Sequence, residues 1–275
     1  MSTAIPELST IAIELNEGVA EVHLNRPQRS NAINEAMWQE LRAAFAWVDA
    51  TPAVRVAILG GAGRNFCAGI DLAMLAGVGK TVAHVDPGRS REMLRRVILD
   101  LQDCLSSVER CRKPVLAAIQ GACIGGAIDL VSCCDMRYAA AEVQFSVREI
   151  DVGMTADVGT LQRLPRLIAD GIARELAYTG RAVDGQEAQR IGLVNQLFAT
   201  PELLREGVRT IARSIAGKSP LAIRGTKEML NYGRDHSVAD GLNYIATWNA
   251  AMLMSADLEE TMVAMGERRP PRFLD

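Results

Sequence analysis

The sequence lacks the features that mark membrane, secreted and nucleic-acid-binding proteins. Its 275 residues contain no apolar run of the roughly 18 residues that a membrane-spanning helix needs, so no membrane partner is expected. Lysine and arginine form no run and the net charge is -3, which argues against nucleic acid as a partner. Because the N-terminal segment has neither a basic start nor a long apolar stretch, we expect no signal peptide.

Motifs for metals, dinucleotides and serine nucleophiles are also missing. The six cysteines show no CxxC or CxxH spacing and most have apolar neighbours, which indicates reduced core cysteines in a cytoplasmic protein and no metal site. A GxGxxG motif from Gly61 would need glycine at position 66, where Phe66 stands. No GxSxG motif is present and the three histidines lie in no motif, so Ser–His–Asp chemistry is not expected.

The pattern of strands and helices changes near residue 200. Before that point, Thr10–Leu24 alternates like a β-hairpin, and the apolar runs Val54–Leu59 and Val115–Ile119 predict buried strands. After it, every periodic segment is helical. We therefore predict an α/β core over residues 1–200 and a helical C-terminal region over residues 201–275.

Caps and helical spacing predict two helices between these strands. Asn34 is suited to cap the first helix, and Ser90 is suited to cap the second. Between the two helices, Ala76–Gly88 is polar and contains glycine, so we expect a mobile loop there.

The stretch that follows the strand Val115–Ile119 is the most informative part of the chain. A glycine-rich turn ends at Gly126 and opens an apolar helix that carries one acid, Asp129. Glu149 and Asp157 follow in a segment of apolar and small residues. Backbone N–H groups at a helix start, followed by carboxylates in apolar surroundings, predict a site that holds an oxyanion and transfers protons.

Several motifs in chain order resemble those of the crotonase (enoyl-CoA hydratase/isomerase) superfamily. They are Asn25-Arg26-Pro27 with Asn31-Ala32-Ile33-Asn34, Phe66-Cys67-Ala68-Gly69-Ile70-Asp71-Leu72, Lys113-Pro114-Val115 with Gly121, Gly125, Gly126 and Ala127, and Gln162-Arg163-Leu164-Pro165. The resemblance covers nearly the whole chain and implies a spiral of ββα units, with C-terminal helices that build a homotrimer or homohexamer. It also implies an acyl-CoA substrate, with coenzyme A as part of that substrate and no separate cofactor.

The same resemblance implies an oxyanion hole made by the backbone N–H groups of Ile70 and Gly126. Removing a proton next to a thioester puts negative charge on its oxygen, and two preorganised donors stabilise that charge where it forms. Losing one such donor typically costs about 3 kcal/mol. Because Gly126 stands where a helix begins, the helix dipole adds to the stabilisation.

The three acids resemble those of one subgroup, the Δ3,5-Δ2,4-dienoyl-CoA isomerases. Typical hydratases of the family have glutamate at the position of Asp129 and glycine at that of Asp157. The resemblance implies that a 3,5-dienoyl-CoA becomes a 2,4-dienoyl-CoA by proton transfer from C2 to C6. We predict that Glu149 takes the C2 proton, that Asp157 protonates C6, and that Asp129 tunes the pKa values of the pair.

Two other functions stay open at this point. One is a 2-enoyl-CoA hydratase in which Glu149 and Asp129 activate a water molecule. The other is an acyl-CoA-binding protein without turnover. A change in substrate mass separates the three, because hydration adds a water, isomerisation leaves the mass unchanged and a binder does neither.

Residues that contact the coenzyme A group are less well defined by the sequence. The phosphates of coenzyme A need basic partners, and Arg29 and Lys227 are candidates for that role. Ala68 and Asp71 flank the predicted oxyanion position and are further candidates for contact with the group.

Overall fold

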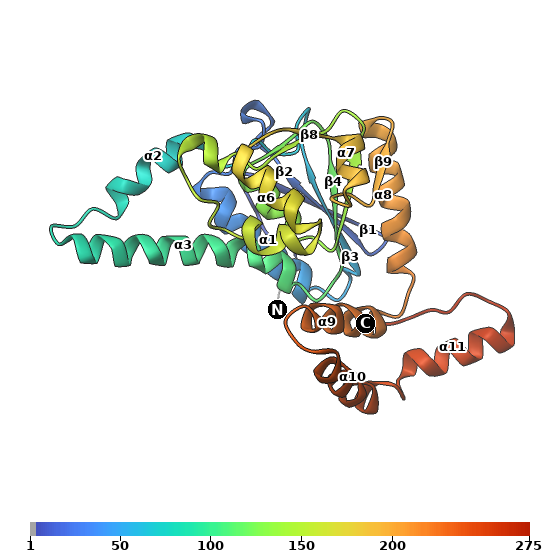
Figure 1. Cartoon of the computed structure of the whole chain (residues 1–275). Helices are drawn as coiled ribbons and strands as arrows, with labels where there is room; N and C mark the ends of the chain where they lie inside the picture. The colour runs from blue at the N-terminus through green and yellow to red at the C-terminus, as the bar shows by residue number, and fades with distance from the viewer. Residues whose placement is uncertain (1–3) are drawn as a thin grey trace.

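A computed structural model describes residues 4–275, and a six-stranded sheet lies at its centre (Figure 1). The prediction that no signal peptide is present concerns the N-terminal segment, and the first three residues of that segment lie outside this range. The strands follow the order β1-β2-β3-β4-β6-β9, and each neighbouring pair is parallel except the β1–β2 hairpin. Their bounds are Ile11–Asn16 (β1), Val19–Leu24 (β2), Val56–Gly61 (β3), Val115–Ile119 (β4), Met136–Ala140 (β6) and Gln196–Phe198 (β9).

The β1–β2 hairpin confirms the alternation seen in the sequence. Glu17 and Gly18 form its two-residue turn, and their φ angles are 50° and 78°. Positive φ at both central residues matches the turn to the twist of the two strands.

Helix α1 (Glu35–Ala50) also begins where the sequence predicts. The side chain of Asn34 accepts a hydrogen bond from the backbone N–H of Met37 at 3.0 Å, which confirms the predicted cap. The helix buries Leu41 and Phe45 and packs against β1, β2 and helix α3 (Pro87–Arg110).

The expected loop over Ala76–Gly88 is largely helical, so that prediction is wrong for most of its length. Helix α2 (Leu72–Thr81) is capped by Asp71, and α3 begins at Pro87 after a cap by Asp86 rather than by Ser90. The alanine, leucine and methionine residues that open α2 favour a helix strongly enough to outweigh its glycines. Figure 1 shows α2 and the first half of α3 as an arm that projects from the body.

A second, three-stranded sheet lies beside the first, and two of its three strands were not indicated by the sequence. Its order is β5 (Ala122–Ile124), β7 (Gln144–Ser146) and β8 (Val183–Asp184). Ala122–Ile124 was expected to be part of a turn. Three residues between two glycines are too few to show a period of two, which explains the missed strand.

Short helical segments connect the later strands. Their bounds are Pro27–Arg29 (η1), Gly126–Ser132 (α4), Glu149–Val152 (η2), Thr160–Arg163 (α5), Leu164–Arg166 (η3), Asp170–Thr179 (α6) and Gly185–Arg190 (α7). Within residues 4–275, none of the helices combines the length and apolar character needed to cross a membrane.

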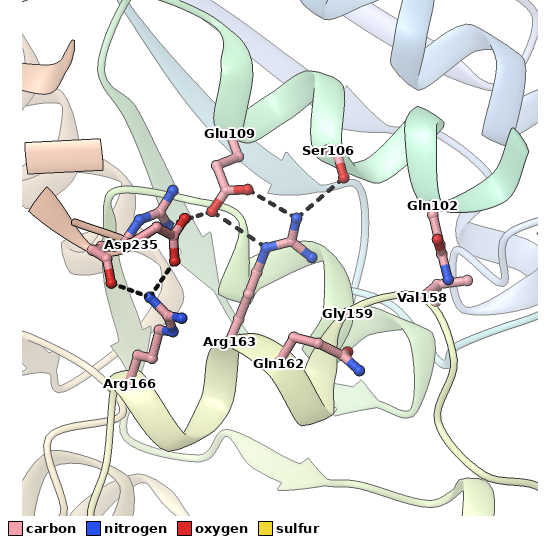
Figure 2. A pocket seen from close by; sticks show the side chains of 10 residues that line it. Gln102, Ser106, Glu109, Val158, Gly159, Gln162, Arg163, Arg166 and Asp235 are labelled. Carbon is pink, nitrogen blue, oxygen red and sulfur yellow. Dashed lines mark hydrogen bonds and ion pairs between the residues drawn. The ribbon is translucent and has the colours of Figure 1, made fainter. Parts of the chain in front are cut away.

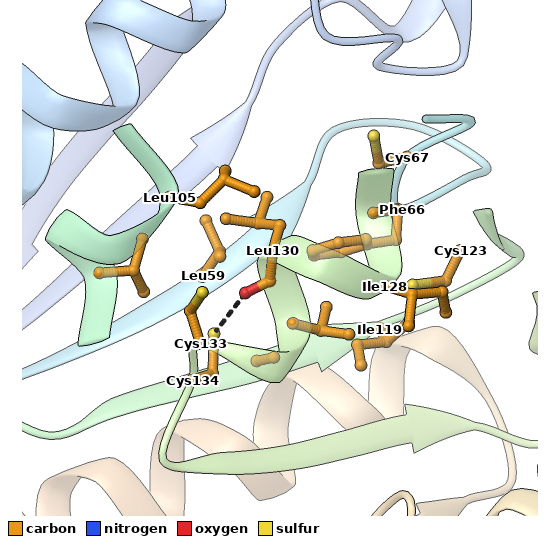
Figure 3. Close-up of a cluster of buried hydrophobic side chains, with 14 of the residues drawn as sticks. Leu59, Phe66, Cys67, Leu105, Ile119, Cys123, Ile128, Leu130, Cys133 and Cys134 are labelled. Atoms are coloured by element: carbon orange, nitrogen blue, oxygen red, sulfur yellow. Dashed lines mark hydrogen bonds between the residues drawn. The ribbon is translucent and has the colours of Figure 1, made fainter. Parts of the chain in front are cut away.

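The main core lies between the large sheet and helices α1, α3 and α4, and it contains the cysteines. Figure 3 shows Cys133 and Cys134 among Leu59, Leu105 and Leu130. All six cysteines are free and buried, which confirms the interpretation of core thiols. Burial raises the pKa of the Cys133 thiol to about 12, so the thiol stays protonated and acts as a small apolar group.

Helix α8 (Pro201–Ala216) covers the opposite face of the large sheet. Its buried residues Leu204, Val208 and Ala212 pack in one cluster with residues of β2, β3, β4 and β6. The predicted boundary at residue 200 assigned this helix to the C-terminal region, whereas its packing joins it to the core. The reason is that an amphipathic helix has the same pattern whether it covers a sheet or another helix.

The last three helices lie below the sheet in Figure 1 and have little contact with it. They are α9 (Pro220–Gly233), α10 (Val238–Met252) and α11 (Ala256–Glu267). Large apolar side chains remain exposed on this region, among them Leu242 (64%), Met254 (88%), Met262 (65%) and Met265 (70%).

Lys227 on α9 fastens this region to the core. Its side chain is only 5% exposed, and its ammonium donates to the Asp135 carboxylate at 2.7 Å and to the Lys113 carbonyl at 3.0 Å. The expectation that Lys227 contacts coenzyme A phosphates is therefore contradicted, because its charge is enclosed and paired inside the protein.

Replacing Lys227 with methionine should destabilise the fold. The change leaves the Asp135 carboxylate without its buried partner, and we expect the free energy of unfolding to fall by about 2–3 kcal/mol. Chemical denaturation measures this difference, with the exposed Lys218→Met as the matched control. Equal stability of the two variants would show that the ion pair contributes nothing.

Candidate active site

Two backbone N–H groups come together beside α4. Gly126 is the first residue of that helix, and a Cβ atom placed on it would lie 3.7 Å from the backbone nitrogen of Ile70. Within residues 4–275, neither of these two N–H groups donates to a protein acceptor. Two unused amides this close are able to bind one oxygen atom of a ligand together.

Pairing between two segments holds these amides in place. Cys67 donates through its N–H to the Ala122 carbonyl at 2.9 Å, and Ile124 donates back to the Cys67 carbonyl at 3.1 Å. Gly69 has φ of 93°, and a Cβ on it would lie 2.7 Å from the Ile124 carbonyl oxygen. Only glycine fits there, so the close approach of the two segments depends on that residue.

Asp129 and Glu149 meet next to the same helix start. Asp129 lies one turn after Gly125 and therefore on the same face of α4. The Glu149 carboxylate comes from η2, and its Oε1 lies 3.3 Å from where a Cβ of Gly125 would be. Asp129 Oδ2 and Glu149 Oε2 are both buried, and no hydrogen-bond partner for either occurs in the described part of the chain.

Asp157 approaches from a third segment. Thr160, three residues later, donates its N–H to Asp129 Oδ1 at 2.5 Å, which ties this segment to α4. Gln102 of α3 donates to the Asp157 carbonyl at 2.6 Å from the other side. The sequence did not reveal either contact, because both use backbone atoms and leave no signature in residue type.

The surroundings raise the pKa of all three acids. Burial raises the pKa of Asp129 to about 6. Burial and then the charge of Asp129 raise the pKa of Glu149 to about 7, and burial also raises the pKa of Asp157. Carboxyl groups with pKa values like those of Asp129 and Glu149 exchange protons near neutral pH, whereas ordinary surface acids are fully ionised there.

The other predicted contact residues lie at the edge of this site. Arg29 is exposed at the end of η1, and the next residue, Ser30, accepts a hydrogen bond from the N–H of Ala68 at 2.9 Å. Asp71 caps α2 and pairs with Arg26 at 3.0 Å, and these bonds lower its pKa. Asp71 thus has a structural role in this arrangement. Among the described residues, no group of histidine, cysteine and acidic side chains is suited to hold a metal.

Together these features define a class of protein: an α/β fold in which two unused backbone amides lie beside acids with raised pKa values. A family model described as enoyl-CoA hydratase/isomerase matches residues 14–275. The chain belongs to the enoyl-CoA hydratase/isomerase family. The predicted crotonase-like fold is therefore confirmed, and an acyl-CoA substrate follows from the family.

Individual relatives agree with this assignment. The peroxisomal Delta(3,5)-Delta(2,4)-dienoyl-CoA isomerase of Arabidopsis thaliana is 46% identical over 267 residues, which cover 97% of this chain and 96% of the relative. The mitochondrial Delta(3,5)-Delta(2,4)-dienoyl-CoA isomerase of Homo sapiens is 42% identical over 252 residues, covering 91% and 77%. The crystal structure of an enoyl-CoA hydratase from Bacillus anthracis has a TM-score of 0.88 and 32% identity, covering 97% and 99%.

The names of these relatives contradict the expectation of a cytoplasmic protein. The Arabidopsis relative is named peroxisomal and the human relative mitochondrial. The prediction of a cytoplasmic location relied on the reduced cysteines. It was wrong because buried thiols carry no information about organelle targeting, which depends on separate targeting signals.

The raised pKa of Glu149 has a consequence for stability. Its pKa rises from 4.5 to about 7 on folding, so the stability it contributes is full below pH 4.5 and is lost as pH rises through 7. Glu149→Gln cannot ionise, and we expect its stability relative to the wild type to increase from about pH 5 to about pH 8.

Urea unfolding across this pH range measures the effect. The exposed Glu206→Gln serves as the control and should differ from the wild type by a constant amount. A constant difference for Glu149→Gln as well would mean that its carboxyl group is not perturbed.

Proposed function

We propose that this enzyme isomerises 3,5-dienoyl-CoA to 2,4-dienoyl-CoA. The observation that carries the proposal is the presence of Asp157, a second acid with a raised pKa, in the same site as Glu149 and the two free amides. The relatives named as dienoyl-CoA isomerases support it.

The reaction begins at the carbon next to the thioester. Glu149, as the carboxylate, removes a proton from C2, and the electron pair moves onto the thioester oxygen. The N–H groups of Ile70 and Gly126 stabilise that oxygen, and each such donor is worth about 3 kcal/mol. The negative charge of the resulting dienolate is spread along the conjugated chain as far as C6.

Protonation at C6 completes the reaction. Asp157, as the neutral acid, gives its proton to C6 while the electron pair returns from the oxygen, and the 2,4-diene forms. C2 and C6 are too far apart for one rigid carboxyl group to serve both. Two acids on separate segments, η2 and the residues before α5, meet this need.

The two acids must start in opposite protonation states. Glu149 must be ionised, and its pKa of about 7 makes this form available at neutral pH while keeping it basic enough to remove a proton. Asp157 must be protonated, which burial favours. In this mechanism Asp129, through its charge, keeps Glu149 basic.

No separate cofactor enters these steps, and coenzyme A acts as part of the substrate. Arg29 is the basic residue that we retain for contact with its phosphates, because it is exposed beside the Ala68 segment. The proposal includes Ala68 as a backbone contact for the same group.

Hydration of a 2-enoyl-CoA is the second candidate function. The unpartnered oxygens of Asp129 and Glu149 favour it, because two carboxyl groups are able to hold one attacking water between them. A relative solved as an enoyl-CoA hydratase also supports this alternative. Product mass separates the two reactions.

The decisive variant is Asp157→Asn, which keeps the size of the side chain and removes its transferable proton. We expect dienoyl-CoA isomerisation to fall by about 100-fold or more, the usual scale for general acid–base catalysis. Exchange of the C2 proton with deuterated water should survive, because Glu149 still forms the dienolate. Conjugated-dienoyl absorbance and product mass follow the two reactions.

Two further variants make this test specific. Asp151→Asn is the matched control, since Asp151 is an exposed acid in the same region and pairs with Arg148. It should leave isomerisation unchanged, and Glu149→Gln should abolish isomerisation and exchange together. If Asp157→Asn isomerises at the wild-type rate, the two-acid mechanism fails and hydration becomes the first candidate.

We also propose that the protein assembles as a homotrimer or homohexamer through α9–α11. Their exposed apolar side chains, such as Leu242 and Met262, are stabilised when another copy covers them. Light scattering should therefore give a trimer or hexamer of the 29.7 kDa chain. A monomer at micromolar concentration would contradict this assembly.

A further inference from the structure

Helix α3 presents two different faces along its second half. Cys104, Leu105 and Val108 are buried in the core, which fixes the helix on the body of the protein. Gln102, Ser106 and Glu109, at spacings of four and three residues, share another face. In Figure 2 this polar face looks onto Val158 and Gly159, which follow Asp157. Residues from both sides line a hollow of about 390 Å³.

Arg163 joins that segment to α3. Its guanidinium donates to the Glu109 carboxylate at 2.9 and 3.3 Å and to Ser106 Oγ at 3.1 Å (Figure 2). Both side chains of the Arg163–Glu109 pair are mostly enclosed, with exposures of 16% and 17%. A pair of this kind holds a fixed geometry better than a solvated surface pair does.

The same guanidinium packs directly on the backbone of Gly159. A Cβ on Gly159 would lie 1.9 Å from Arg163 Nη1, and Gly159 has φ of 134°. Asp157 and Gly159 are two residues apart, and the next residue, Thr160, bonds Asp129. Arg163 therefore packs on the middle of a segment that carries Asp157 and is bonded to Asp129.

The segment is thus held from two sides. On the α3 side it is bonded through Gln102 to the Asp157 carbonyl and through Ser106 and Glu109 to Arg163. On the α4 side it is bonded through Thr160 to Asp129. Without the Arg163 contacts, Gln102 would make the one side-chain bond between this segment and α3 within residues 4–275.

We propose that Arg163 is a positioning residue, which fixes the segment from Asp157 to Thr160 so that the acid at position 157 reaches C6 of the substrate. This inference rests on the proposed dienoyl-CoA isomerisation. Within residues 4–275 the Arg163 side chain bonds Glu109 and Ser106 and not Glu149, which belongs to the separate turn η2. Loss of Arg163 should therefore affect the second proton transfer and spare the first.

The test is Arg163→Met, which keeps a long side chain and removes the guanidinium. Glu109 retains Arg234 as a partner in this variant, so its carboxylate is not left unpaired. We expect the kcat of isomerisation to fall by about 10- to 100-fold, the usual effect of a misplacement near 1 Å, with little change in KM. Exchange of the C2 proton with deuterated water should continue near the wild-type rate.

Arg166→Met is the matched control. Arg166 lies three residues further on and lines the same hollow, but it is half exposed and bonds Asp235 and the Arg234 carbonyl. It should keep the wild-type ratio of isomerisation to exchange. Arg163→Lys keeps the charge without the two-pronged geometry, and its ratio should lie between those of Arg163→Met and the wild type.

The ratio of the two rates decides the result. If folded Arg163→Met has the wild-type ratio of isomerisation to exchange, the positioning role is overturned. If Arg163→Met does not fold, the same ratio in Arg163→Lys decides the question. An equal loss of isomerisation and exchange would also overturn the positioning role, since that indicates general damage to the site. If the wild type itself exchanges the C2 proton but does not isomerise, the proposed function fails, and this inference fails with it.

Discussion

The pairing of two backbone segments, residues 67–71 and 122–126, is the constraint on which the site depends. Their hydrogen bonds bring the N–H groups of Ile70 and Gly126 side by side without using either of them. Glycine at position 69 allows this approach, because any Cβ there would collide with the Ile124 carbonyl of the opposite segment. The direction of α4, and with it the place of Asp129, follows from where the pairing ends.

The acids show a compromise between stability and chemistry. Three carboxyl groups in one partly enclosed space repel each other when ionised and lose the solvation that water would give them. Arg163 lies behind the segment that carries Asp157, where its guanidinium pairs with the Glu109 carboxylate. The acids therefore keep raised pKa values, which proton transfer at neutral pH needs.

Much of the fold could be predicted from the sequence, and the reasons for the failures are physical. An apolar run located β4, helical spacing and a clear cap located α1, and ordered motifs indicated the family. The strand β5 was missed because it is three residues long, and α2 because its helix-favouring residues outweigh its glycines. The acids were found by residue type, whereas Gln102 and Arg163 were not assigned roles, since they act on backbone that the sequence does not place.

The late position of α8 affects the protein while it is being synthesised. All parts of the candidate site are complete by residue 163, but α8 does not leave the ribosome until more than 200 residues have been made. Until then, the apolar face formed by Val56, Leu116 and Tyr138 has no cover. If the strands pair before α8 is made, this face is open to other chains during synthesis, and exposed apolar surface of this kind favours aggregation.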